Sequence, residues 1–195
     1  MNVFLGITGA SGAPYAARLL EALVGAGCEV GVCVSDAGYE VLATELYRDP
    51  TLSREAVLER LVPGDGVAVF AKDDYKAPYA SGSAAVDGYV VCPCSMATAA
   101  AIAAGAMANL VHRAASVALK EERKLVLVPR ETPLSAIHLE NLLRLRRAGA
   151  TIVFAAPGFY HAPDTVGDLV DFVVGRCLDQ LGIENTLVRR WGQET

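Results

Sequence analysis

The chain has 195 residues, of which 53% are hydrophobic and 20% are charged. This composition excludes a disordered or low-complexity protein, and the length fits one domain, 1–195, with a sizeable core. Seventeen Lys and Arg residues against 22 Asp and Glu residues give a net charge of −5. That balance argues against a nucleic-acid partner and against binding to a membrane surface. Any anion site must therefore be a local cluster of basic residues.

Apolar runs predict strands that alternate with helices along the whole chain. The expected strands are 2–8, 29–35, 86–92, 124–129 and 151–154. The expected helices are one that opens at GASGAP and ends near Gly25, then 37–47, 96–119 with a break near Ala108, 134–149 and 165–181. The segment 49–76 has no regular pattern. This alternation indicates a three-layer α/β/α sandwich with a mainly parallel sheet.

Two features of the sequence favour a cytoplasmic protein. The first residues, MNVFLGITGASG, lack the basic start of a signal peptide. The five cysteines are odd in number and lie mostly in apolar runs, which favours reduced thiols over a disulfide framework. The stretch 88–111 carries no charge, but Pro93, Gly105 and Asn109 interrupt it. We therefore expect a buried strand and a packed helix there, and no membrane span.

Polar residues cluster directly after five of the predicted strands. Ordinary loop polarity is one explanation, but ligands of parallel sheets bind at the carboxyl ends of the strands. Five such loops at one edge would form a ligand site. The clusters are 8–13, 35–36, 92–98, 129–133 and 157–161.

Gly6, Gly9 and Gly12 follow a G-x-x-G-x-x-G pattern at the first strand-to-helix turn. Such a turn lets backbone amides approach an anion, and nicotinamide, flavin and nucleotide binders share it. A short-chain dehydrogenase also needs a Tyr-x-x-x-Lys pair, and none of the seven tyrosines has a lysine at that spacing. Asp36 either binds a ribose or caps a helix.

Ser95 and Thr98 flank the start of a helix, so they either hold a phosphate or a flavin edge, or only cap the helix. The CPC segment at 92–94 has no second cysteine pair, and His138-x-Glu140 lacks the downstream cysteines of a deaminase. We therefore expect no metal.

Arg130 and Glu131 come directly after a strand, where a guanidinium can bind phosphate and a carboxylate can move a proton. Thr132 and Pro133 look like a helix N-cap followed by a first-turn proline. Lys120, Tyr160 and Arg176 are further candidates for phosphate binding, although each is more commonly a surface or core-edge residue.

Several segments together closely resemble the UbiX-type flavin prenyltransferases. They are GITGASGAPYAARLL, ASGS, CPCSMAT, NLVHRAASVALKEERKLVLVPRETPLSAIHLENLLRL, PGFYHAP and DLVDFVVGR. The resemblance runs from residue 3 to the RRWG segment near the C-terminus and weakens only over 46–75. It implies a flavodoxin-like, Rossmann-type fold, assembled as a dodecamer with active sites between subunits. We expect the tail, 183–195, to pack on a neighbouring subunit.

The resemblance also implies a reaction. The dimethylallyl group of dimethylallyl monophosphate would be joined to N5 and C6 of reduced FMN, without a metal. The product, prenylated FMN, would serve a UbiD-type decarboxylase.

Site residues are carried over by position from the same resemblance. Ser11, Glu45, Lys120 and Glu131 would be catalytic, with the Ser11 hydroxyl near N5 of the flavin. FMN would contact Gly9, Ala10, Ser11, Ser35, Ser95, Met96, Ala97, Thr98, Arg113 and Arg130. The prenyl phosphate would contact Tyr75, Lys120, Arg130, Tyr160 and Arg176.

Two positions depart from the family pattern. Tyr75 stands where a tryptophan is common, and Ala97 stands where Lys or Gly is common. Two alternative functions fit the sequence less well. A flavin-dependent cysteine decarboxylase would need an early histidine and a Pro-x-x-x-Asn-Thr loop, but no histidine precedes His112. A flavin carrier without chemistry would not need a second phosphate pocket.

Overall fold

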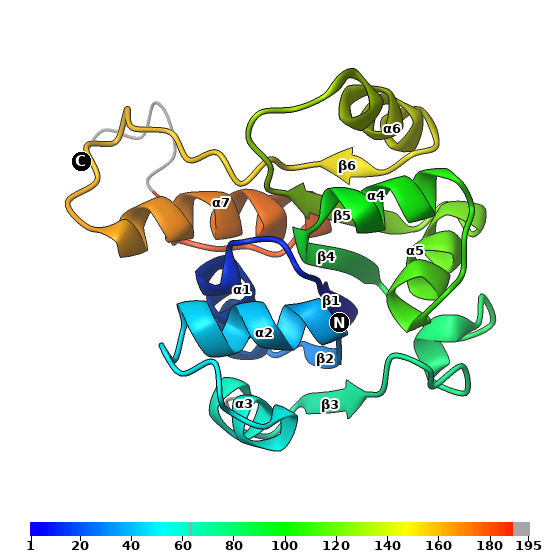
Figure 1. Ribbon diagram of the computed structural model, residues 1–195, viewed down its shortest axis with the longest axis horizontal. Helices are drawn as coiled ribbons and strands as arrows, with labels where there is room; N and C mark the ends of the chain where they lie inside the picture. Colours follow the sequence, from blue (N-terminus) through cyan, green and yellow to red (C-terminus); the bar gives the residue numbers. More distant parts are fainter. Residues whose placement is uncertain (63, 189–195) are drawn as a thin grey trace.

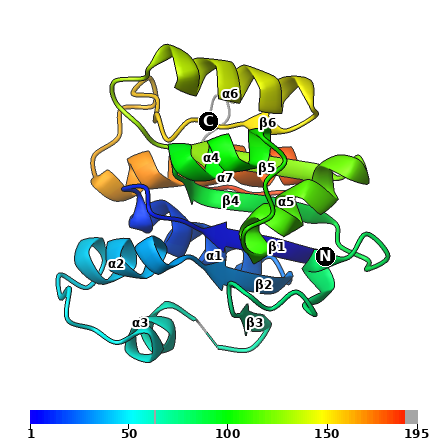
Figure 2. The same ribbon diagram turned by 45° about the vertical axis from the view of Figure 1, so that its right-hand side comes forward.

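Six parallel strands form the centre of the protein, in the order β3-β2-β1-β4-β5-β6 (Figure 2). The computed structural model describes residues 1–62 and 64–188. The strands are β1 (Asn2–Ile7), β2 (Glu29–Val34), β3 (Val67–Phe70), β4 (Gly88–Cys94), β5 (Lys124–Pro129) and β6 (Thr151–Ile152). All neighbouring strands run parallel, as the sequence predicts.

Helices cover both faces of the sheet, which confirms the three-layer α/β/α sandwich (Figure 1). Apolar residues of α1, α2, α3 and α7 share one core, and those of α4, α5 and α6 share the core on the other face. The helices are α1 (Ala13–Gly25), α2 (Asp36–Glu45), α3 (Arg54–Leu61), α4 (Met96–Ala103), α5 (Leu110–Lys120), α6 (Ala136–Arg147) and α7 (Val166–Leu181), with a 3₁₀ turn at Pro78–Ala80.

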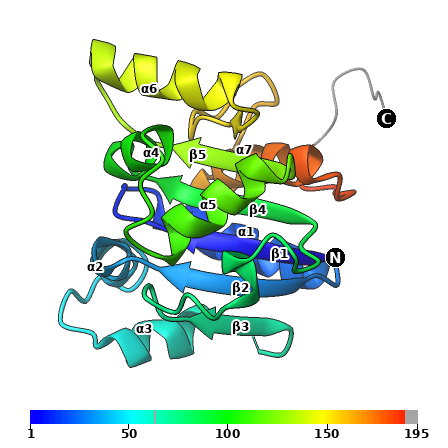
Figure 3. The same ribbon diagram turned by 90° about the vertical axis from the view of Figure 1, so that its right-hand side faces the viewer.

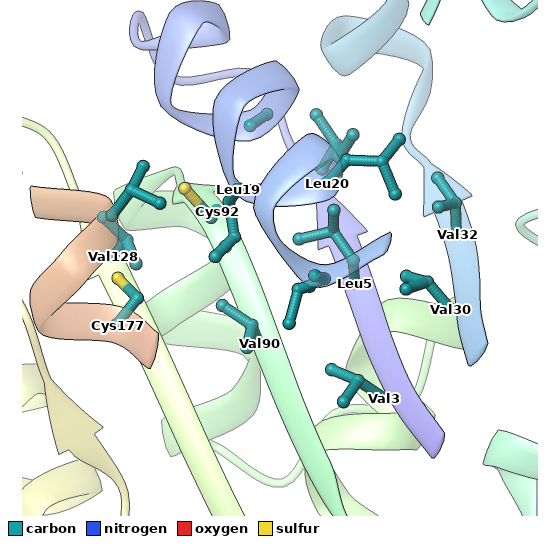
Figure 4. Packing of buried hydrophobic residues seen from close by; sticks show 14 of the residues in the cluster. Val3, Leu5, Leu19, Leu20, Val30, Val32, Val90, Cys92, Val128 and Cys177 are labelled. Atoms are coloured by element: carbon teal, nitrogen blue, oxygen red, sulfur yellow. The ribbon is translucent and has the colours of Figure 1, made fainter. Parts of the chain in front are cut away.

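The first core is built mainly from α1 lying on the central strands (Figure 4). Leu19 and Leu20 of α1 are fully buried, as are Leu5 of β1 and Val90 of β4. Burial of each leucine contributes about 1.5–3 kcal/mol. The position of α1 in this core fixes where its N-terminus, and therefore the glycine turn before it, lies.

Two elements of the segment 49–76 were missed by the sequence analysis. Residues 54–61 form α3, and residues 67–70 form the edge strand β3. The middle residues of β3, Ala68 and Val69, are exposed, because the strand pairs on one side only. The apolar pattern that marks a buried strand is therefore absent.

Strand β4 runs two residues further than predicted, through Pro93 to Cys94. The pairing with β5 shifts register between Val91 and Cys94, so Cys92 packs in one core and Cys94 in the other. The sequence suggested an end at Cys92 because proline is rare within a central strand. Strand β6 is shorter than predicted, with two residues.

The charge-free stretch is β4, then α4, then the start of α5, with the predicted break between the helices. Over the described residues, none of the helices combines the length and the apolar character needed to cross a membrane. All five cysteines are free and buried, as expected. Burial raises the pKa of the Cys94 thiol to about 12, which disfavours the reactive thiolate.

The described part of the C-terminal tail folds back on its own helix. Ile183 is buried in the first core, and the Asn185 side chain donates to the Gly175 carbonyl over 3.4 Å. The predicted contact with a neighbouring subunit stays a prediction, and residues 189–195 lie outside the described residues.

The chain reverses its direction across the sheet between β1 and β4. Strands β2 and β3 lie on one side of β1, and β4, β5 and β6 lie on the other. This order is that of doubly wound nucleotide-binding folds, in which ligands bind at the reversal point, outside the carboxyl ends of the strands. In Figure 3 the arrowheads point toward the side where α2 and α4 lie. A ligand site is expected at that edge.

Candidate active site

The turn from β1 to α1 needs glycine at two positions. A Cβ atom at Gly9 would collide with the Cβ of Ala37 in α2, and Gly12 has φ of 136°, a conformation that other residues rarely adopt. Gly9 and Ser11 are exposed at the carboxyl edge of β1, while Ala10 is buried. The turn therefore presents backbone and one hydroxyl at the reversal point.

Glu45, the last residue of α2, binds the start of α1. Its Oε2 accepts hydrogen bonds from the amides of Gly12 and Ala13, both over 2.8 Å. Desolvation raises the pKa of this carboxyl, but hydrogen bonds from Ser11, Gly12 and Ala13 and the charge of Arg130 outweigh it and lower the pKa. Glu45 is therefore ionised and engaged with the turn.

Arg130 joins the end of β5 to the same turn. Its Nε donates to the carbonyl oxygen of Ser11 over 3.1 Å. Glu131 follows it, and its Oε1 accepts from the Thr132 amide over 3.1 Å. The structure thus brings Ser11, Arg130 and Glu131 to the carboxyl ends of the strands, as the polar clusters after the strands predict, and it adds Glu45 to this group.

Ser95 begins α4 as its N-cap, and its Oγ accepts from the Thr98 amide over 3.2 Å. Its hydroxyl also donates to Thr98 Oγ1 over 3.0 Å. The capping interpretation is confirmed, and it leaves the ligand role open, because first-turn amides such as those of Met96 and Ala97 have no partner within a helix. Ala97 is exposed.

Ser35 begins α2 in the same way, and its Oγ accepts from the Gly38 amide over 3.1 Å. The cap is therefore Ser35, so of the two interpretations of Asp36 that of a helix cap is wrong. Asp36 instead accepts from Arg54 Nη2 over 2.7 Å and pairs with Lys72. The Lys72 hydrogen bond, with help from Arg54, lowers the pKa of Asp36. A phosphate bound at Ser35 would lie near the Asp36 carboxylate, whose charge is balanced by Arg54 and Lys72.

Tyr75 and Arg113 form a separate group around Met107. The Tyr75 hydroxyl donates to the Met107 carbonyl over 3.2 Å, and Arg113 contacts the Met107 sulfur over 3.2 Å. Arg113 Nε also donates to the Ala80 carbonyl over 2.9 Å. These contacts join the segment after β3 to α5, and none reaches the turn after β1.

Lys120 lies at the other end of the strands, away from the turn after β1. It ends α5 and shortly precedes Lys124, the first residue of β5, so it lies near the amino ends of the strands. Its ammonium group pairs with Glu121 and lies beside Gly82. Within one chain Lys120 therefore stays apart from Ser11 and Arg130, and a shared site needs a second copy.

Arg176, in the middle of α7, borders a cavity of about 330 Å³ beside β6. Phe154 and Phe172 supply apolar walls, and the Arg176 guanidinium donates to Asp179 Oδ2 over 2.9 Å. Tyr160 lies in the loop before α7, with its ring edge-on to Phe172 at a centroid distance of 5.8 Å. The cavity could take a small apolar group, but an anion on that group would compete with Asp179 for the Arg176 guanidinium.

Helix α6 begins later than predicted, after Ser135, so the N-cap prediction for Thr132 was wrong. Ser135 and His138 form a reciprocal capping box, in which Ser135 Oγ accepts from the His138 amide over 3.2 Å and His138 Nδ1 accepts from the Ser135 amide over 3.3 Å. His138 is thus a capping residue. Across residues 1–62 and 64–188, no three His, Cys, Asp or Glu side chains gather as a metal site would require.

Two features were missed by the sequence analysis. The buried hydroxyl of Thr8 donates to the Pro93 carbonyl in β4 and accepts from the Ser95 amide. His161 stacks flat on Phe172 at 5.5 Å and edge-on to Tyr160 at 5.5 Å, so the three rings hold the loop that carries Tyr160. For the Thr8 contacts, the one signal in the sequence was a threonine directly after a buried strand.

The reversal point fits a flavin mononucleotide. Gly9 and Ala97 are small and exposed on the two sides of that point, so a flat ring can approach the backbone. Ser35 and Ser95 each begin a helix whose first-turn amides can donate to anionic or carbonyl oxygens.

Comparisons with known proteins agree with this geometry. The profile of the Flavoprotein family matches residues 1–178. The flavin prenyltransferase UbiX of Halalkalibacterium halodurans is 50% identical over 191 residues, which cover 97% of this chain and 93% of that protein. The crystal structure of a dodecameric FMN-dependent UbiX-like decarboxylase from Escherichia coli O157:H7 matches with a TM-score of 0.88 and 44% identity, over 99% of this chain and all of that chain.

A third match carries ligands in the expected class. The structure of AnUbiX in complex with FMN and dimethylallyl pyrophosphate has a TM-score of 0.88 and 38% identity, over 100% of this chain and 98% of that chain. The fold and the matched profile define a flavoprotein. Within that class, the chain belongs to the UbiX-type flavin prenyltransferase family, which makes it a transferase.

Proposed function

We propose that the protein joins the dimethylallyl group of dimethylallyl monophosphate to N5 and C6 of reduced FMN and releases phosphate, without a metal. The observation that carries this proposal is the meeting of the turn after β1, Arg130 after β5 and the start of α4 at the point where the strand order reverses. Membership of the family supplies the reaction class.

The flavin lies between the turn after β1 and the start of α4. Gly9, Ala10 and Ser11 contact one part of the ring, with the Ser11 hydroxyl near N5, and 95–98 contact the other. Ser35 binds the FMN phosphate through its hydroxyl proton, because its oxygen already accepts from Gly38. Arg113, which is bound to Ala80 and Met107 and not to the turn after β1, contributes its positive charge from α5. Reduced FMN, when bound, supplies an electron-rich ring as the prenyl acceptor.

The cations of the site stabilise the leaving phosphate. Breaking the C–O bond of the prenyl phosphate builds negative charge on the phosphate, and fixed donors lower the energy of that state. Arg130, Lys120, Tyr160 and Arg176 supply these donors, with Lys120 contributed by a neighbouring copy. Tyr75 provides an aromatic face for the allylic cation character. A monophosphate needs less compensation than a diphosphate, which is consistent with a metal-free site.

Two carboxylates handle protons in this scheme. Glu131 is the better placed, because within residues 1–62 and 64–188 its carboxylate accepts a hydrogen bond from the adjacent Thr132 amide alone. Glu45 is hydrogen-bonded to the turn after β1. Any proton that it transfers is therefore exchanged next to Ser11. The departing phosphate takes the proton from C6.

Lys120 lies too far from Arg130 within one chain to share a site with it, which supports an oligomer whose sites lie between subunits. A UbiX-like relative is dodecameric. We propose the same assembly here, in the cytoplasm, with prenylated FMN passed to a UbiD-type decarboxylase.

Anaerobic incubation with reduced FMN and dimethylallyl monophosphate, followed by mass spectrometry of the extracted flavin, tests the reaction. We expect a mass gain of one prenyl unit with the wild type and none with Arg176→Ala. A parallel reaction with dimethylallyl pyrophosphate identifies the preferred donor. Unmodified FMN with both donors would contradict the proposal.

A flavin carrier is the main alternative, and Glu131→Gln separates the two. In the enzyme this variant binds FMN normally and prenylates slowly, since a neutral amide cannot take a proton. Unchanged turnover would exclude Glu131 from proton transfer. A cysteine decarboxylase is disfavoured, because no histidine precedes His112.

A further inference from the structure

The side chain of Thr8 is almost completely buried between β1 and β4. It is 2% exposed, and apart from buried tyrosines and cysteines the only other buried side chain with a polar group among the described residues is that of Thr98. Burial of a hydroxyl costs free energy unless both its donor and its acceptor capacity are used. The partners of Thr8 therefore explain its place.

The Thr8 hydroxyl connects two loops that are far apart in sequence. It donates to the Pro93 carbonyl over 2.8 Å, and its oxygen accepts from the Ser95 amide over 2.8 Å. The Thr8 amide donates to the same Pro93 carbonyl over 3.2 Å. Thr8 immediately precedes Gly9, so these bonds hold the glycine turn against the start of α4.

The connection continues into α4. Ser95, whose amide is held by Thr8, caps the helix and exchanges hydrogen bonds with Thr98 through both the hydroxyl and the amide of that residue. A chain of hydroxyl groups thus runs from the end of β1 to the first turn of α4. A shift of one loop moves the other.

We propose that Thr8 is a positioning residue of the flavin site, which sets the spacing between the glycine turn and the start of α4. The inference rests on the proposed function, since it takes these two segments as the sides of the flavin site. Thr8 itself is buried and acts through Gly9 and Ser95, so FMN affinity and the orientation of the ring depend on its hydroxyl.

Thr8→Val tests this, because valine keeps the shape and leaves the Ser95 amide without its acceptor. FMN is titrated into each variant, and the visible circular dichroism of the bound flavin reports its orientation. We expect FMN binding about tenfold weaker with an altered dichroism band, and Thr8→Ser, which keeps the hydroxyl, to restore both. Should Thr8→Val fail to fold, Thr8→Ala carries the same expectation.

Tyr79→Phe is a matched control. It removes a buried hydroxyl that donates to the Asn2 side chain over 2.7 Å, at the other end of β1. We expect this variant to keep the FMN affinity of the wild type. Equal loss in Tyr79→Phe, or unchanged binding and dichroism in Thr8→Val, would overturn the inference alone. A wild type without FMN binding would contradict the proposed function as well.

Discussion

Glu45 shows how one carboxylate shapes the turn that it supports. Desolvation raises its pKa, but the hydrogen bonds from Ser11 and from two amides, together with the charge of Arg130, outweigh it and lower the pKa below the usual 4.5. A group with a lowered pKa in the folded state stabilises the protein above the unfolded value. This contribution is lost as the pH falls through the folded value.

We therefore expect Glu45→Gln to lower the free energy of unfolding by about 1–2 kcal/mol at neutral pH. The difference from the wild type should shrink as the pH falls below 4.5. Urea unfolding of both proteins between about pH 7 and pH 3 measures it. Glu40→Gln, an exposed change in the same helix, is the control. A difference that stays constant over this range would show that the charge of Glu45 contributes nothing.

At the scale of elements, the sequence was informative where apolar periodicity was strong. Strands β1, β2 and β5, and helices α1 and α7, were predicted within a few residues. The failures have physical causes. Strand β3 lies at an edge and half exposed, so it lacks a buried pattern, and Pro93 lies inside β4 at a register shift that only the neighbouring strands reveal.

The start of α6 gives a prediction at this scale. Ser135→Ala removes the oxygen that accepts from the His138 amide and should cost about 1 kcal/mol of stability. Thr132→Ala lies outside the helix and should change stability by less than about 0.5 kcal/mol. Denaturant unfolding of both variants decides between the two starts, and a larger loss in Thr132→Ala would contradict the capping box.

At the scale of the whole molecule, the proposed site needs residues from more than one chain, because Lys120 lies at the other end of the strands from Arg130. The loops after β1, β4 and β5 were predicted to meet at one edge, and they do. The sequence carried a signal that Lys120 lies at the other end of the strands, because Lys120 shortly precedes the predicted strand 124–129, but that signal was not used. In the proposed function, Lys120 therefore comes from a neighbouring copy.

Mixed oligomers test this sharing. Lys120→Ala and Arg130→Ala should each be inactive alone, while an equal mixture reassembled from both should recover activity in about one quarter of the sites. That fraction follows because each intact site needs an unchanged Lys120 from one copy and an unchanged Arg130 from another. Arg130→Ala mixed with Ser11→Ala should recover nothing, since one chain supplies both residues. Failure of the first mixture to recover would place both charges in one chain.

The carboxylate beneath the glycine turn also bears on which nucleotides the fold accepts. In dinucleotide-binding proteins with this strand order, the pyrophosphate occupies the N-terminus of the first helix. Here Glu45 already occupies that position as a built-in anion, so a pyrophosphate would meet like charge. The strand order is retained, but the charge of Glu45 disfavours a pyrophosphate at this helix start. The contact between α2 and the start of α1 is therefore better suited to a mononucleotide whose phosphate binds elsewhere.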